Sequence, residues 1–195
     1  MFMHTRSLAK FVQASGTWTQ IGDHVNTISG NLGSDPVSSF LRYHLPVSQA
    51  FEVIECDIEI PFPQAANQPD CAVGLVSRWN GSPNNNNGAI VMWFSFATDG
   101  TGALTGTSFV RVDTYFGGSQ TNVTFPLVLD QYYKVRLVKI GQQTAVFVDD
   151  QFILLNPSSG SVAGNFIGMW AFRAEANFKN FTSCSYKKVP PTLTL

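Results

Sequence analysis

The chain has 195 residues, of which only 13% are charged, and its formal net charge is −1, so it lacks a field that would attract phosphate backbones. Its 44% hydrophobic content, with 16 phenylalanines, provides apolar area for one large core without a metal or disulfide staple. These values exclude nucleic acid as an expected partner and favour a single domain.

The N-terminal stretch MFMHTRSLAKFVQASG contains no apolar run of the kind that a secretory signal needs. No segment is long enough to insert into a membrane. The polar residues are mostly uncharged, a composition that favours an extracellular setting or a particle surface. Cys56, Cys71 and Cys184 are too few for a disulfide framework, and we interpret them as separate buried thiols in preference to a Cys56–Cys71 bridge.

Short β-rich runs separated by Gly, Asn, Pro and Asp recur along the chain, and helical periodicity is nearly absent. In chain order, strands are predicted at residues 17–22, 24–30, 38–45, 51–60, 71–79, 89–97, 108–116, 121–128, 132–140, 144–150, 152–156, 165–173 and 176–186. This number of strands is larger than that of a small immunoglobulin-like sandwich. It predicts an all-β fold, a two-sheet antiparallel jelly-roll sandwich over residues 1–185, followed by a Pro-containing arm or linker at 186–195.

Residues 89–97 and 165–173 are apolar on both strand faces, which predicts central strands with Trp93 and Trp170 in the core. Residues 132–140 instead alternate, with Lys134 and Arg136 on the wet face. Two hairpins should follow, the first turning near Gly141 and the second at residues 149–150.

The C-terminal third resembles the closing strands of the concanavalin A-like lectin/glucanase superfamily, including laminin-G-like jelly rolls. The resemblance rests on an aromatic pair at 132–133, a Gly turn at 141, VFVDD at 146–150, IGMWAF at 167–172 and FKNF at 178–181. It departs at Asp150, where the superfamily usually has Gly. The resemblance implies two curved antiparallel sheets, but no single function, because lectins, hydrolases, adhesion modules and virion parts share that fold.

Glu55, Asp57 and Glu59 occupy one face of the predicted strand 51–60. Their spacing resembles the active-site strand of family-16 glycoside hydrolases, which implies Glu55 as nucleophile, Asp57 as its modulator and Glu59 as acid/base. In that family the Val-Asp-Gly hairpin follows soon after this strand, whereas here about ninety residues intervene. We therefore prefer a solvated strand face and keep a glycoside hydrolase as an alternative.

Two clusters combine aromatic and polar side chains of the kind that bind sugar rings and hydroxyls. The first lies at the end of a strand and in the loop after it, and the second on one face of the strand 108–116. Their residues are Arg78, Trp79, Asn80, Asn84, Asn85, Asn86 and Asn87 in the first cluster, and Arg111, Asp113 and Tyr115 in the second. The favoured hypothesis is a non-enzymatic carbohydrate-binding or adhesion module that uses both.

No cofactor or metal is predicted. Asp99, Asp149 and Asp150 offer oxygens to calcium, but they form no known ligand loop and are interpreted as turn residues. The expected partner is a carbohydrate or glycoconjugate, with a homo-oligomer or larger assembly left open. A structural or decoration module of a virion or surface assembly is the other alternative, and it would show a stable oligomer without glycan affinity.

Overall fold

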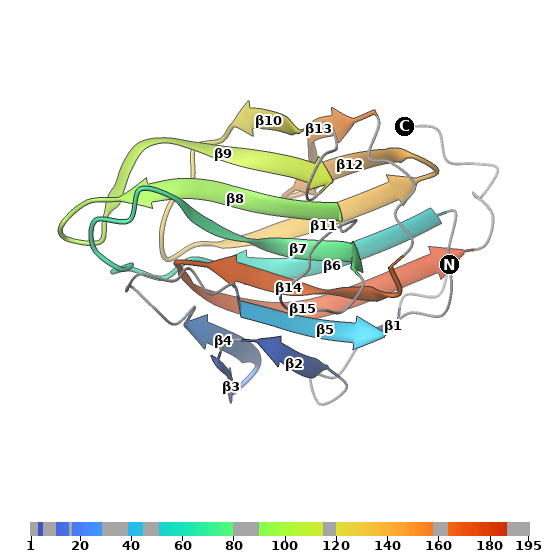
Figure 1. The fold of residues 1–195 in the computed structure, drawn as a ribbon, viewed down its shortest axis with the longest axis horizontal. Coiled ribbons are helices and arrows are strands. Elements are labelled where there is room, and N and C mark those ends of the chain that lie inside the picture. The colour runs from blue at the N-terminus through green and yellow to red at the C-terminus, as the bar shows by residue number, and fades with distance from the viewer. Residues whose placement is uncertain are drawn as a thin grey trace.

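A computed structural model describes residues 4–5, 11–15, 17–28, 39–44, 51–79, 90–114, 120–157 and 164–186. The described residues form two antiparallel sheets stacked face to face (Figure 1). The all-β sandwich that the sequence predicts is therefore confirmed.

Sheet A has eight strands in the order β13-β12-β11-β6-β15-β4-β3, and β1 pairs with β15 beside this path. Its strands are β1 (His4–Thr5), β3 (Thr17–Ile21), β4 (His24–Ile28), β6 (Phe51–Glu59), β11 (Tyr132–Ile140), β12 (Gln143–Val148), β13 (Gln151–Asn156) and β15 (Glu175–Tyr186).

Sheet B has seven strands in the order β10-β9-β8-β7-β14-β5-β2. Its strands are β2 (Val12–Ser15), β5 (Ser39–His44), β7 (Cys71–Trp79), β8 (Ile90–Thr98), β9 (Leu104–Thr114), β10 (Thr121–Thr124) and β14 (Phe166–Phe172). Consecutive strands β7 to β10 form a meander, whereas β14 and β5 join it from distant parts of the chain.

The main core fills the space between the two sheets. Alternate residues of each strand enter it, as Ile54, Cys56, Ile58 and Ile60 do along β6 and the segment after it, and all four are fully buried. Burial of one such isoleucine side chain contributes about 1.5–3 kcal/mol, so the inner faces of the sheets supply most of the stabilisation.

The two predicted central strands are confirmed, because β8 lies between β7 and β9 and β14 lies between β7 and β5. Both predicted hairpin turns are also present. Gly141 has φ 58°, and the two-residue turn between β12 and β13 has positive φ at Asp149 and Asp150, 50° and 62°. That pair of angles is typical of a type I′ turn.

Some strand boundaries differ from the prediction. β10 ends at Thr124 although the predicted strand continues to 128, because Pro126 has no N–H to donate to the sheet. β9 begins four residues early, at Leu104, and passes through Gly106 at φ 69°. Strands β1 and β2 were not predicted. Tyr186 ends β15, and the rest of the predicted arm lies outside the described residues.

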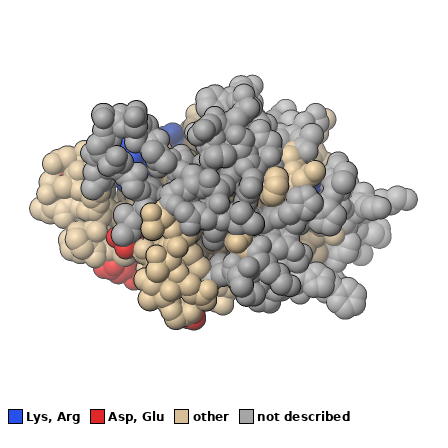
Figure 2. Space-filling model, turned by 60° about the horizontal axis from the view of Figure 1, so that its bottom comes forward, with Lys and Arg blue, Asp and Glu red and all other residues tan. Residues whose placement is uncertain are grey.

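The described surface carries few charged side chains on the face that Figure 2 shows, in keeping with the low charged fraction of the sequence. Within the described ranges, no helix has the length and apolar character to span a membrane.

Candidate functional site

The face of sheet B that points away from the core carries a separate set of side chains. Residues that pair in register on neighbouring strands lie on the same face of the sheet. The pairs across β9, β8, β7 and β14 therefore form rows on this face. The central row contains Arg111, Trp93, Gly74 and Trp170, and the next row contains Phe109, Ser95, Ala72 and Phe172.

Trp93 and Trp170 meet across Gly74, which has no side chain to keep them apart. Their ring centroids lie 5.8 Å apart at an interplanar angle of 85°, an edge-to-face contact. Phe172 stacks on Trp170 with centroids 6.4 Å apart and planes 21° apart. The two indoles are nearly buried, with exposed fractions of 8% and 4%, and together with Ala72, Val76 and Val91 they form a second apolar cluster.

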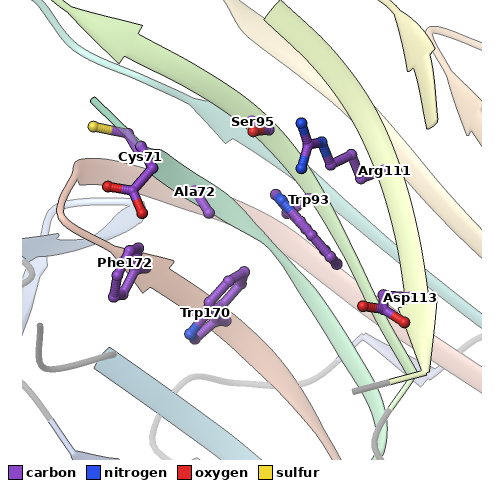
Figure 3. Close-up of a pocket in the computed structure, with 9 residues that line it drawn as sticks. Cys71, Ala72, Trp93, Ser95, Arg111, Asp113, Trp170 and Phe172 are labelled. Carbon is purple, nitrogen blue, oxygen red and sulfur yellow. The ribbon is translucent and has the colours of Figure 1, made fainter. Parts of the chain in front are cut away.

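A pocket of about 330 Å³ opens beside this aromatic cluster. It forms because Ala72 and Ser95 are small, whereas the residues around them are large. Figure 3 shows Trp93 and Arg111 on one side of these small residues, and Trp170 and Phe172 on the other. The lining residues are Asp70, Cys71, Ala72, Trp93, Ser95, Arg111, Asp113, Trp170 and Phe172.

Arg111 brings an unsatisfied donor to this pocket. Its guanidinium carbon lies 5.2 Å from the centroid of the Phe109 ring, a cation–π contact, and its Nε is buried without a hydrogen-bond partner. Asp113 lies two residues further along the same face of β9, so a cation and a carboxylate flank the pocket.

Asp70, which lines the pocket, forms an ion pair with Arg173. Arg173 also lies over the Phe172 ring, 5.0 Å from its centroid. The Cys71 thiol donates to the Arg173 carbonyl at 3.1 Å, and burial raises the pKa of Cys71 to about 12. Cys71 is therefore a protonated structural thiol and not a nucleophile.

The described members of the two predicted binding clusters lie in different places. Arg111 and Asp113 border one pocket, but Arg78 is only 4% exposed and forms an ion pair with Glu52 at 3.2 Å. Arg78 is thus buried between the sheets, and we exclude it from the candidate site. Trp79 is seven residues beyond Ala72 along β7, which places its Cα about 23 Å further along the strand. The other predicted residues, Asn80, Asn84, Asn85, Asn86, Asn87 and Tyr115, lie outside the described residues.

Sequence reasoning assigned Trp93 and Trp170 to the core and so missed their place in the pocket. Both are buried, as expected, but on the outer face of sheet B. The available signal was the pattern in β8 and β14, where large aromatic residues on the outer face align with Ser95, Gly74 and Ala72. Large and small residues in neighbouring positions leave a hollow.

The three carboxylates of β6 lie on the outer face of sheet A, on the other side of the sandwich. Each accepts a hydrogen bond from its own partner on a neighbouring strand. The donors are Arg136 Nε to Glu55 at 2.7 Å, Asn180 Nδ2 to Asp57 at 2.7 Å and Asn177 Nδ2 to Glu59 at 2.8 Å. Arg136 and Asn177 pair in register with the residues they bond, so these are cross-strand pairs typical of a solvated sheet face.

Residues proposed as turn aspartates have structural partners. Asp99 Oδ1 accepts from the Thr101 N–H at 2.8 Å, the Thr101 hydroxyl at 2.7 Å and the Ala103 N–H at 3.2 Å. These bonds, those from Thr101 above all, lower the pKa of Asp99. The described residues bring together no group of three His, Cys, Asp or Glu side chains that could hold a metal ion.

No protein-family model matches the chain, and no curated protein matches its sequence. Solved structures do match it. The carbohydrate-binding module CBM66 from Bacillus subtilis superposes with a TM-score of 0.60 at 18% identity, over 90% of this chain and 96% of that one. The Emp47p carbohydrate recognition domain gives 0.59 at 8% identity, over 91% and 89% of the two chains.

An enzyme is also among the similar structures. The marine PL7 alginate lyase AlyA1 from Zobellia galactanivorans gives a TM-score of 0.55 at 11% identity, over 92% of this chain and 96% of that one. Identities this low establish the fold and leave the function open. The chain has the concanavalin A-like jelly-roll fold that the resemblance of its C-terminal strands predicted.

Proposed function

We propose that the protein is a non-enzymatic carbohydrate-binding module whose ligand occupies the pocket on the outer face of sheet B. The observation that carries this proposal is the pocket itself, in which aromatic side chains surround a small floor beside Arg111 and Asp113. The carbohydrate-binding and carbohydrate recognition domains among the similar structures support the same class of ligand.

The chemistry of the pocket suits a sugar. A pyranose presents an apolar C–H surface, for which the half-buried Phe172 ring and the edge of Trp93 provide contact area. Sugar hydroxyls both donate and accept. Arg111 can only donate and the Asp113 carboxylate can only accept, so the two bind a pair of hydroxyls in a defined orientation. A volume of about 330 Å³ is at the lower end of the range for ligand pockets and suits a short saccharide.

The loop residues predicted from the sequence remain part of the proposal as further contacts. Trp79 ends β7, Ile90 begins β8 and Thr114 ends β9, and register pairs place these three strand ends at one end of sheet B. The loops that carry Asn80, Asn84, Asn85, Asn86, Asn87 and Tyr115 start from this end. We propose that a longer glycan extends from the pocket toward it.

A glycan array with the purified protein, run with calcium and again with a chelator, tests the proposal. We expect selective binding in both conditions. Arg111→Gln and Phe172→Ala should each weaken it at least tenfold, or about 1.4 kcal/mol, without loss of folding by thermal melting. Arg136→Gln is the matched control, because Arg136 lies on the outer face of sheet A and bonds Glu55.

Each result has a definite meaning. Equal binding by wild type and Arg111→Gln would place the site elsewhere on the molecule. Loss of binding in chelator alone would indicate a calcium site. An array without hits would contradict the proposal and favour a structural or decoration module, for which a stable oligomer is then the expected finding.

A further inference from the structure

A layer of polar residues crosses the inner face of sheet A at one end of the sandwich. Register pairs align five residues from five adjacent strands, and we call this row the polar layer. It consists of Asn156 of β13, Thr144 of β12, Lys139 of β11, Glu52 of β6 and Ser185 of β15. Two positions deeper on three of the same strands lie Leu154, Leu137 and Ile54 of the main core. The polar layer therefore faces sheet B.

Sheet B contributes two residues of β7 to the same place. The Ser77 hydroxyl donates to Glu52 Oε1, and Arg78 Nε lies 3.2 Å from Glu52 Oε2. Regular alternation would turn Ser77 and Arg78 to opposite faces. Arg78 instead adopts φ 57°, and the register between β7 and β14 is irregular at this point. A left-handed residue other than Gly is costly, so its backbone here is held by the surrounding structure.

The charged groups of this region are almost completely removed from solvent. The exposed fractions are 1% for Glu52, 4% for Arg78 and 5% for Lys139. Among the described residues, two cations thus face one carboxylate, and that carboxylate already interacts with Ser77 and Arg78. Unbalanced buried charge is strongly unfavourable, so the excess positive charge requires a counter-charge.

Lys139 carries the positive charge that lacks a partner carboxylate among the described residues. Its Nζ is buried without a hydrogen-bond partner, although an ammonium has three donors. Burial, with repulsion from Arg78, lowers the pKa of Lys139 to about 8, which still leaves the amine mostly protonated at neutral pH. The hydroxyl of Ser183, one row deeper on β15, is likewise buried without a partner. Donors without acceptors on the inner face of one sheet point to a missing acceptor.

We propose that Lys139 Nζ, on the inner face of sheet A, binds a small monovalent anion between the two sheets. Lys139 Nζ donates to it, and the charge of Arg78 adds to the attraction. Arg78, Lys139 and Glu52 together carry one excess positive charge, which one monovalent anion balances. A divalent anion would leave an excess of negative charge. This site is separate from the pocket on the outer face of sheet B and does not depend on carbohydrate binding.

Thermal melting in chloride and in gluconate at equal ionic strength tests the site, since screening by salt is then the same. For the wild type, we expect the melting temperature to rise with chloride concentration at pH 7 and to be insensitive to chloride at pH 9.5, where Lys139 is neutral. Lys139→Met should remove the chloride dependence at pH 7, whatever its own stability. Lys134→Met is the matched control, because Lys134 is on the wet face of the same strand and pairs with Asp150.

Crystals of the wild type grown in bromide provide a test that requires no variant. An anomalous peak within hydrogen-bond distance of Lys139 Nζ would establish the site. Absence of that peak, together with equal melting temperatures in chloride and gluconate, would overturn the proposal.

Discussion

Gly74 lies where β7 and β8 approach closely beneath the contact of Trp93 with Trp170. A Cβ added at this position would lie 1.8 Å from the Met92 carbonyl oxygen and 2.7 Å from the Trp93 Cα. These are backbone atoms, which cannot move aside without opening the sheet. We expect Gly74→Ala to lower the free energy of unfolding by about 1–3 kcal/mol, measured by denaturant titration.

Gly100→Ala is the control for this substitution. The nearest atoms to an added Cβ belong to the flexible side chain of Asn67, at 3.5 and 3.8 Å, which is ordinary van der Waals contact. We expect a change within about 0.5 kcal/mol. If Gly74→Ala unfolds at the same denaturant concentration as the wild type, the two strands do not approach as closely as described.

At the scale of elements, the β12–β13 hairpin depends on two aspartates with different roles. The Asp149 side chain accepts from the Lys134 N–H at 2.9 Å and so ties the turn to β11. Asp150 pairs with Lys134 and Arg136, but it is exposed, and such surface pairs contribute little. We expect Asp149→Ala to destabilise the protein by about 1–2 kcal/mol in urea unfolding.

Asp150→Gly should behave differently, because Gly adopts φ 62° without strain and the lost ion pairs are weak. We expect unchanged or slightly higher stability. The result also tests the departure from the superfamily pattern at this position, since Gly is the residue usually found there. A loss as large as that of Asp149→Ala would show that the surface ion pairs stabilise the hairpin.

The outer face of β6 gives a prediction about chemistry. Glu55 and Glu59 are bonded by Arg136 and Asn177, which lie on β11 and β15, on opposite sides of β6. A retaining glycosidase instead needs two carboxyl groups about 5–5.5 Å apart at one sugar ring. We expect Glu55→Gln and Glu59→Gln to leave glycan-array binding unchanged, and neither the wild type nor the variants to release reducing sugar. Sugar release by the wild type that Glu55→Gln abolishes, without a lower melting temperature, would establish the hydrolase alternative.

Sequence patterns predicted the strands better than the site. Strand faces follow a period of two, so the double-sided apolar runs identified β8 and β14 as interior strands. The same pattern could not show that Trp93 and Trp170 meet over Gly74, because this contact also needs the register of β7 with β14, which is distant in the chain. Lys139 continues the inward positions of β11, but only the register with Glu52 shows that it faces a buried carboxylate.

At the scale of the whole molecule, the two faces of the sandwich and its interior have separate roles. The outer face of sheet B holds the aromatic pocket, and the outer face of sheet A holds a network of cross-strand pairs. Between them, the polar layer interrupts the apolar core at one end. Since the charge of this layer is shielded from solvent, pH should change the stability of the whole fold through it.

The pKa of Lys139 is lowered from an ordinary 10.5 to about 8, so between these values the unfolded chain binds a proton that the folded chain does not. Stability from this group therefore rises with pH across that range, by up to about 1.4 kcal/mol per pH unit. Burial raises the pKa values of Cys56 and Cys71, and their contributions have the opposite sign, but they are present in both the wild type and Lys139→Met. The difference in free energy of unfolding between the two proteins, measured by urea titration in chloride-free buffer, should shift in favour of the wild type from pH 8 to pH 10. A flat difference would mean that Lys139 is not buried beside Arg78 in the folded protein.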